Sequence, residues 1–392
     1  MEQSSKFRFG IIGLGAHALL AHGPAISRSP VGITFAACAD VRPEAVKSWV
    51  QAYGGTGYTD YLEMVRKEQL DGVLLVTWPN QHREHIEKLL AAGVRNILCE
   101  KALTITGKEA AEIYEMAEKA GAFIMEGFMY RHNPAVRKLS QVLSIGHLGK
   151  IDSIRACFSC YDPELESPDD ANRNWRQRKE CGGGIPYDFA CYCVNCCGHF
   201  AGGLPTRVYA IGNVSKYDTI NRAYGTIEYD NGVVGIIESS KTTSYTQEVQ
   251  INCAGGILNL PIAWTIDRTM TITQRHTGWN STTYDTFVSD WVPDHLLSYQ
   301  LQAENFVAAV RGHARPVVPL LESVVNTHAV EALVTSVLER RPVDISIPRE
   351  IAGAFARMMK PGRPPNSEER RENSEQGTGN KEPGTRSLEQ GA

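Results

Sequence analysis

The 392-residue sequence lacks a strong excess of charge, since 40 lysines and arginines stand against 44 aspartates and glutamates. A net charge of −4 gives no electrostatic reason to expect a nucleic acid or an anionic membrane as a partner. No apolar run is long enough to cross a bilayer, so we expect no membrane span. The polar residues 1–6 and the glycines soon after them do not form a signal peptide. We therefore expect a cytoplasmic protein.

Cysteine is plentiful, and its meaning depends on its placement. Ten cysteines are present, and Cys191, Cys193, Cys196 and Cys197 crowd together just before His199. Without an export signal, a chain this long is not expected to carry a disulfide framework. Closely spaced cysteines can bind zinc or an iron–sulfur cluster. On a helix, however, consecutive side chains point in different directions, and buried free cysteine packs as a small apolar residue. We expect no metal site.

Strand and helix patterns alternate through residue 127. We expect strands at 7–12, 33–39, 71–77, 95–99 and 123–126, and helices at 17–28, 43–53, 81–92 and 108–120. Such alternation predicts a parallel, doubly wound sheet. We assign residues 1–127 to a Rossmann dinucleotide-binding domain.

The pattern changes after residue 127. A bridging helix is expected at 133–144, further helices at 184–198, 297–311 and 321–340, and strands at 151–160, 207–214, 225–229, 233–239 and 248–254. Turn residues between these strands predict a mostly antiparallel sheet. We assign residues 128–360 to a second α/β domain. Residues 361–392 contain almost no apolar side chains, so we expect a disordered tail.

A glycine-rich turn follows the first strand. In Gly13-x-Gly15-x-x-Ala18, the first glycine permits a tight turn and the second lets the backbone approach a pyrophosphate. The small Ala18 lets the helix pack against the strand, and the helix N-terminus favours phosphate. Any strand–turn–helix unit can carry glycines, but the strand before this turn and Asp40 after it favour dinucleotide binding.

Asp40 ends the second strand and bears on the choice of dinucleotide. A carboxylate there can accept both ribose hydroxyls of NAD and would repel the 2′-phosphate of NADP. Arg42, two residues further on, could face that phosphate instead. We expect NAD, with NADP as the alternative.

Three further residues fit an acid/base site. Lys101 follows a strand at the carboxyl edge of the sheet, where open α/β sheets bind ligands. Asp188 and Tyr192 are four residues apart on a predicted helix and share a face. A phenol is a poor base at neutral pH, but a nearby ammonium lowers its pKa. We expect Lys101 to activate Tyr192 in this way. Otherwise Lys101 is a surface lysine, Asp188 a helix cap and Tyr192 a core residue.

These residues, with several flanking segments, resemble the Gfo/Idh/MocA oxidoreductases, named for glucose–fructose oxidoreductase and inositol dehydrogenase. The resemblance spans about residues 6–350. It rests on GLGAHA at 13–18, TWPNQH at 77–82, Glu100-Lys101, FMYRHNP at 128–134 and GGGIPYDFACY at 182–192. It implies a Rossmann domain followed by an α/β domain whose open, mostly antiparallel sheet is commonly an oligomer interface.

The resemblance also implies roles for individual residues. Lys101 matches the lysine of a Glu-Lys-Pro motif, Asp188 a substrate-orienting aspartate, and Tyr192 the acid/base of the tyrosine branch, which includes xylose and dihydrodiol dehydrogenases. Arg131 is expected near the substrate. Motifs and resemblance together give these cofactor-binding residues: Gly13, Gly15, Ala16, His17, Asp40, Arg42, Thr77, Asn80, His82, Glu100, Lys101, Trp175 and Arg176.

Two residues depart from the family pattern. Ala102 stands where proline is usual, which leaves the position of Lys101 open. Asp40 differs from the Ser-Arg ending common among NADP-using tyrosine members.

We interpret the chain as an NAD(P)-dependent dehydrogenase or reductase of a sugar, cyclitol or related polyol. We expect a homodimer or homotetramer formed through the second sheet. One alternative is a redox-neutral, NAD-dependent glycosidase or lyase, and another is a non-catalytic dinucleotide sensor.

Overall fold

The computed structural model describes residues 6–163, 174–265, 270–277, 282–289 and 294–359. The tail expected at 361–392 lies outside these residues. Among the described residues, no helix combines the length and the apolarity that a membrane span needs.

A six-stranded parallel sheet forms the first half, with the strand order β3-β2-β1-β4-β5-β6. Its strands are β1 (Phe7–Ile12), β2 (Ile33–Ala39), β3 (Thr56–Tyr58), β4 (Gly72–Leu75), β5 (Asn96–Cys99) and β6 (Phe123–Glu126). The central strands β1 and β4 are short apolar runs that are almost wholly buried, as parallel strands between helices are. The order reverses at β1, which is the switch point where such sheets bind dinucleotides.

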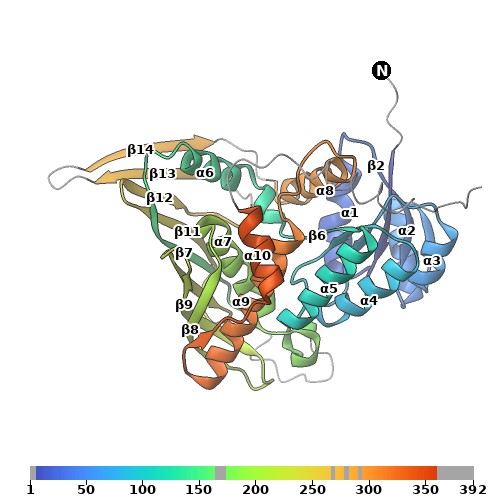
Figure 1. Cartoon of the computed structure of the whole chain (residues 1–392). Coiled ribbons are helices and arrows are strands. Elements are labelled where there is room, and N and C mark those ends of the chain that lie inside the picture. Colours follow the sequence, from blue (N-terminus) through green and yellow to red (C-terminus); the bar gives the residue numbers. More distant parts are fainter. Residues whose placement is uncertain (1–5, 164–173, 266–269, 278–281, 290–293, 360–392) are drawn as a thin grey trace, which may run out of the picture. The chain divides into compact units, whose positions relative to one another are not determined.

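The helices of this half are drawn in blue and cyan in Figure 1. They are the π-helical turn η1 (Ala18–His22), α1 (Gly23–Ser27), α2 (Pro43–Tyr53), α3 (Tyr61–Lys67), α4 (Pro79–Ala91) and α5 (Gly107–Ala120). Sequence-encoded signals fix their ends. Thr106 accepts a hydrogen bond from the Glu109 N–H at the start of α5, and Gly121 ends it in the left-handed conformation.

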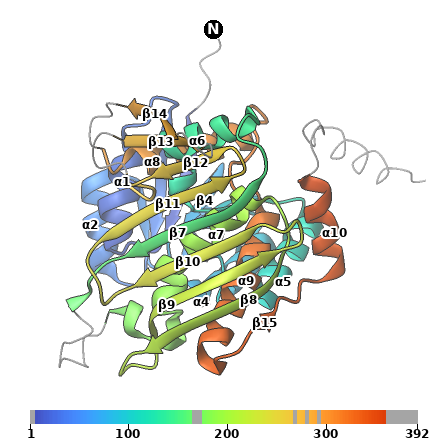
Figure 2. The same ribbon diagram turned by 90° about the vertical axis from the view of Figure 1, so that its left-hand side faces the viewer.

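The second half contains a nine-stranded sheet, ordered β14-β13-β12-β11-β7-β10-β9-β8-β15 and seen from one face in Figure 2. Its strands are β7 (Ile151–Ser159), β8 (Pro205–Val214), β9 (Ile220–Tyr229), β10 (Val234–Ser240), β11 (Thr246–Cys253), β12 (Gly256–Leu260), β13 (Met270–Thr277), β14 (Thr282–Ser289) and β15 (Val343–Asp344). Within this sheet, β7 and β10 are the only described strands that pair in parallel, and the other described strand pairs are antiparallel. The predicted, mostly antiparallel sheet is confirmed.

Helices cover one face of this sheet. Besides the short helical turns η2 (Met129–His132), η4 (Trp175–Gln177), η5 (Lys179–Cys181) and η6 (Pro186–Ala190), they are α6 (Pro134–Ser144), α7 (Cys191–Ala201), α8 (Leu297–Val310), α9 (Leu320–Glu339) and α10 (Arg349–Met358). Helix α7 packs on β7 and β10, and α9 packs on both β8 and α5. Helix α9 therefore joins the two halves, and residues up to Met359 form one compact unit. The domain boundary at residues 127/128 stays a prediction.

Several elements differ from the sequence-based expectation. The helix expected at 17–28 is the π-helical turn η1 followed by α1, and the one at 184–198 is the π-helical turn η6 followed by α7. Helices α3 and α10 and strands β3, β12, β13, β14 and β15 were not predicted.

Candidate active site

The glycine turn has the geometry that a dinucleotide phosphate requires. Gly13 has a φ of 89°, and a side chain there would bring a Cβ within 2.6 Å of the Val76 carbonyl oxygen. A Cβ at Gly15 would meet no heavy atom within 4 Å, so the backbone is open to a ligand there. Ala16 and His17 are exposed helical residues between this turn and η1. The turn therefore fits the pyrophosphate of NAD(P).

Asp40 is tied directly to this turn. Its Oδ2 accepts a hydrogen bond from the Leu14 N–H (2.8 Å), and its Oδ1 accepts from the Arg42 N–H (2.9 Å) and Nε (3.0 Å). Burial acts to raise the pKa of Asp40, but the bonds from Arg42 and Leu14 outweigh it and lower the pKa. Arg42 thus neutralises the Asp40 carboxylate, which was expected to repel the 2′-phosphate of NADP.

Lys101 and Asp188 meet across the two halves of the molecule. The Lys101 ammonium donates to the backbone oxygen of Asp188 (2.8 Å) and lies 3.3 Å from its Oδ1. Lys101 follows β5 and Asp188 lies in η6, so each half supplies one partner. The peptide bond from Lys101 to Ala102 is cis. Burial acts to lower the pKa of Lys101, but the charge of Asp188 prevails and raises it.

Two more cations face the other oxygen of Asp188. Arg176 Nε lies 2.9 Å and Lys241 Nζ 3.1 Å from Oδ2. Burial would raise the pKa of Asp188, but Lys101, Arg176 and Lys241 together hold it well below its usual range. The sequence analysis missed Lys241.

Tyr192 lies beside Lys101 in an aromatic setting. Its hydroxyl donates a weak hydrogen bond to Met129 Sδ (3.5 Å), and the Lys101 ammonium is 4.8 Å from the ring centroid. Burial raises the pKa of Tyr192 well above its ordinary value. The lowered pKa expected for Tyr192 is therefore not found, because burial prevails and the Lys101 ammonium faces the ring and Asp188 rather than the phenol oxygen.

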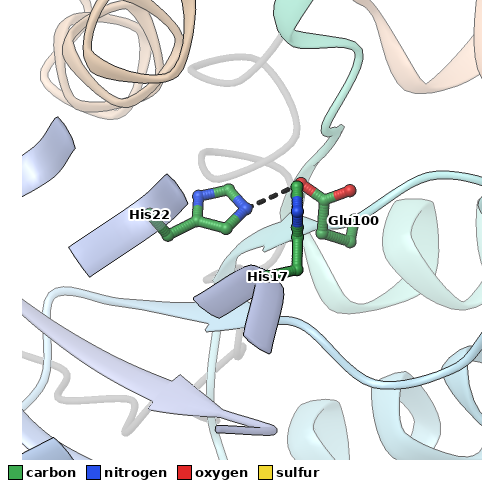
Figure 3. Close-up of side chains that lie close together, drawn as sticks. All are labelled: His17, His22 and Glu100. Carbon is green, nitrogen blue, oxygen red and sulfur yellow. Dashed lines mark hydrogen bonds and ion pairs between the residues drawn. The ribbon is translucent and has the colours of Figure 1, made fainter. Parts of the chain in front are cut away.

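Glu100 joins two histidines of the first helical turns (Figure 3). Its Oε1 lies 2.7 Å from His22 Nε2 and 3.7 Å from His17 Nε2. Its Oε2 accepts from the Lys101 N–H (3.1 Å). Although burial acts to raise the pKa of Glu100, the bonds with His17 and His22 hold it well below its ordinary value. Glu100 therefore fixes the backbone of Lys101 against η1.

His82 is buried and bonds to the backbone of two neighbouring segments. Its ring is fully buried, and its nitrogens lie 3.0 Å from the carbonyl oxygens of Ala102 and Thr77. It thereby joins the segment after Lys101 to the start of α4. The resemblance implied that His82 binds the cofactor, but its buried ring is occupied by these backbone contacts. Asn80 is exposed in the first turn of α4 and stays a candidate.

Arg131, expected near the substrate, has its guanidinium occupied by other groups of the protein. Its guanidinium is buried and bonds to Glu322, to His199 Nδ1 (2.7 Å) and to Asn195 Oδ1 (3.3 Å). These bonds tie η2 to α7 and α9 and use the donors that a substrate would need. Arg131 therefore links elements of the fold, whereas Arg176 pairs with Asp188 and its guanidinium lies 4.9 Å from the centroid of the Trp175 ring. The role of Trp175 and Arg176 in binding the cofactor stays a prediction.

Most of the cysteines are buried in the core. All ten are free, and those of α7 are buried. Burial raises the pKa of the Cys197 thiol to about 12. These thiols therefore stay protonated and pack as apolar groups.

A dinucleotide turn and a lysine in one half, facing a carboxylate and a phenol in the other, define a nicotinamide-dependent oxidoreductase. Comparison with known proteins agrees. Residues 7–128 match the model of the oxidoreductase family with an NAD-binding Rossmann fold, and residues 136–259 match the GFO/IDH/MocA C-terminal domain. The chain belongs to the GFO/IDH/MocA family and is an NAD(P)-dependent oxidoreductase.

Individual relatives are similar over most of the chain. D-xylose 1-dehydrogenase (NADP(+)) 2 of Haloferax volcanii is 29% identical over 331 residues, which are 84% of this chain and 96% of that protein. Among solved structures, KijD10, a 3-ketoreductase from Actinomadura kijaniata in complex with NADP and TDP-benzene, has a TM-score of 0.72, with 23% identity over 85% of this chain and 98% of its own. Levoglucosan dehydrogenase in complex with NADH and levoglucosan has a TM-score of 0.76, with 19% identity over 87% of this chain and all of its own (100%).

Proposed function

We propose that this protein transfers hydride between the nicotinamide of NAD(P) and a carbon of a sugar, cyclitol or related polyol. The observation that carries this proposal is the contact of Lys101 with both Asp188 and the ring of Tyr192. Its relatives act on xylose, on scyllo-inositol and on a dihydrodiol, according to their names. All are substrates with a hydroxyl at the reacting carbon and another beside it.

The residues have distinct tasks in this reaction. The bound nicotinamide accepts or delivers the hydride. The Tyr192 phenol, with its raised pKa, keeps its proton at neutral pH and can donate it to a carbonyl oxygen as the alcohol forms. Lys101 binds the same oxygen with its ammonium, and the ionised Asp188 accepts a hydrogen bond from a neighbouring hydroxyl. In the reverse direction, the deprotonated phenol takes the proton of the alcohol, and the Lys101 ammonium stabilises the negative charge that develops on the substrate oxygen.

The choice of cofactor is part of the proposal. We favour NAD, because Asp40 ends β2 beside the glycine turn. NADP stays the alternative, since Arg42 pairs with Asp40 and neutralises its charge. A cytoplasmic location and a carbohydrate or polyol as the small-molecule partner belong to the same proposal.

We further propose that two copies associate through the nine-stranded sheet. Helices cover one face of that sheet. Large apolar side chains stand exposed on β8 and β10, among them Tyr209 (45%), Ile211 (55%) and Ile236 (37%). An apolar sheet surface of this kind favours association.

Replacing Tyr192 by Phe tests the reaction. We expect turnover to fall by about 10²- to 10⁴-fold, the usual contribution of a general acid/base, while NADH binding is unchanged. Absorbance of reduced nicotinamide would be followed with NAD and NADP against aldoses, inositols, anhydrosugars and glycosides.

Tyr130→Phe is the matched control, because the Tyr130 hydroxyl is also buried but donates to Asn195. It should keep most of the turnover. Normal turnover of the Tyr192 variant would exclude Tyr192 as the acid/base. Release of free sugar without reduced nicotinamide would instead identify the redox-neutral glycosidase.

A further inference from the structure

Lys241 is a buried cation that the reaction described above does not use. It follows β10, and its side chain is 3% exposed. Its ammonium lies 3.1 Å from Asp188 Oδ2, 3.4 Å from Asp162 Oδ2 and 5.3 Å from the centroid of the Phe189 ring. Removing an ammonium from water is unfavourable unless it has close partners, so these carboxylates define its position.

The backbone around Lys241 is fixed as well. Its N–H donates to the Asn221 carbonyl (2.8 Å), and its own carbonyl accepts from the Asp162 N–H (2.9 Å). Gln177 Nε2 donates to Asp162 Oδ2 (3.2 Å). The ammonium of Lys241 is therefore held by the ends of β7 and β10, independently of the Rossmann half.

The cations divide between the two oxygens of Asp188. Lys101 faces Oδ1 and the backbone oxygen, whereas Arg176 and Lys241 face Oδ2. The Arg176 side chain is 36% exposed, so solvent screens its charge, but Lys241 is screened little. If Lys101 moves onto a substrate oxygen, Asp188 still keeps a buried counter-ion on its other side.

From this arrangement we propose that Lys241 is a positioning residue, which holds the Asp188 carboxylate in place and so leaves Lys101 free to bind the reacting oxygen. The inference rests on the proposed function, and it adds to the site a cation that no substrate atom has to touch. Asp188 thus exchanges Lys101 for a substrate hydroxyl without becoming an unpaired buried charge.

The first test compares Lys241→Met with Lys241→Arg. The methionine keeps the unbranched shape and most of the length of the side chain without its charge. We expect kcat to fall roughly 10- to 100-fold through misplacement of Asp188, with NADH binding unchanged. The arginine should restore much of kcat because it can still reach a carboxylate. Arg155→Met is the control, since it removes a cation that pairs with Glu238 between β7 and β10 outside the site. It should leave kcat unchanged.

The pH dependence separates positioning from simple support of the fold. Asp188 is faced by Lys101, Arg176 and Lys241, with Cys191 and Tyr192 also close. Because loss of Lys241 removes one cation that keeps Asp188 ionised, the acidic limb of the kcat profile should move to higher pH in Lys241→Met. A profile that keeps its wild-type position would contradict the inference.

A double-mutant cycle gives the decisive comparison. If Lys241 acts through Asp188, then adding Lys241→Met to Asp188→Asn should lower kcat no further. Additive losses, or a wild-type kcat in Lys241→Met, would overturn the proposal.

A readout without substrate keeps this inference separate from the proposed function. The carboxyl carbon of Asp188, assigned by its absence in Asp188→Asn, can be titrated by NMR, and its midpoint should rise in Lys241→Met. Wild-type protein without turnover on any polyol would defeat the proposed function, whereas an unchanged midpoint would defeat the inference about Lys241.

Discussion

Among the single residues, Glu126 is a buried acid that holds the segment following Lys101. It ends β6, its side chain is buried, and its Oε1 accepts a hydrogen bond from the Leu103 N–H (2.7 Å). Burial raises its pKa to about 8, so the carboxyl group is mostly neutral at neutral pH. The segment after Lys101 is therefore fixed by a buried acid that carries little charge.

We expect the stability of the protein to depend on pH through this group. Its folded-state pKa of about 8 lies above the ordinary 4.5, so its contribution is fully present below 4.5 and is lost as pH rises through 8. Glu126→Gln keeps an acceptor for Leu103 but cannot ionise. With rising pH, the free energy of unfolding of Glu126→Gln in urea should increase relative to that of the wild type, by a few kcal/mol at most. A difference that is constant with pH would contradict this assignment.

The sequence indicated which residues come together at the site, but it did not indicate the orientation of their side chains. Lys101 and Asp188 could be assigned to one site from the sequence, because Lys101 follows a strand end and Asp188 belongs to a recognisable motif. Lys241 could not, because its place beside Asp188 depends on the register of β10 against β7 and β9. Nor could the sequence show that the Lys101 ammonium lies over the Tyr192 ring, since that depends on side-chain packing.

Among the elements, α5 depends on its first turn. Thr106 and Glu109 form a capping box, and the next N–H, that of Gly107, donates to Glu331 of α9 (2.9 Å). The cap thus orders α5, and α9 packs on both α5 and the second sheet. This signal was readable in the sequence as Thr-x-x-Glu before an apolar run.

Removing this cap should destabilise the whole protein. Thr106→Ala should lower the free energy of unfolding by about 1 kcal/mol, because the Glu109 N–H loses its acceptor. Thr106→Ser keeps a hydroxyl and should lose only a small part of that. Equal losses in the two variants, measured by urea unfolding, would mean that the methyl group and not the cap matters.

The π-helical turns η1 and η6 account for two of the differences between the expected and the observed elements. Each replaces the first part of an expected α-helix, and each carries a residue of the site, His22 and Asp188 respectively. Hydrophobic periodicity identifies a helix but does not distinguish its hydrogen-bonding pattern locally.

For the whole molecule, the exposed face of the nine-stranded sheet leads to a prediction about assembly. Ile211 stands exposed on β8, two residues from Tyr209 and therefore on the same face. Ile211→Lys would bring two like charges into a symmetric interface, so we expect a lower mass by light scattering at equal concentration. Leu338→Lys, which changes an exposed residue of α9, is the control. A wild-type protein that is already monomeric would refute the proposed interface.

The meeting of Lys101 with Asp188 and Lys241 has a consequence for how such enzymes diversify. The dinucleotide turn and the lysine are encoded before residue 102, while Asp188 and Lys241 come from the other sheet. Mutations that reshape the second sheet can therefore give a new substrate preference without rebuilding the hydride-carrying half. The two halves can change separately as long as the ion pair between Lys101 and Asp188 is preserved.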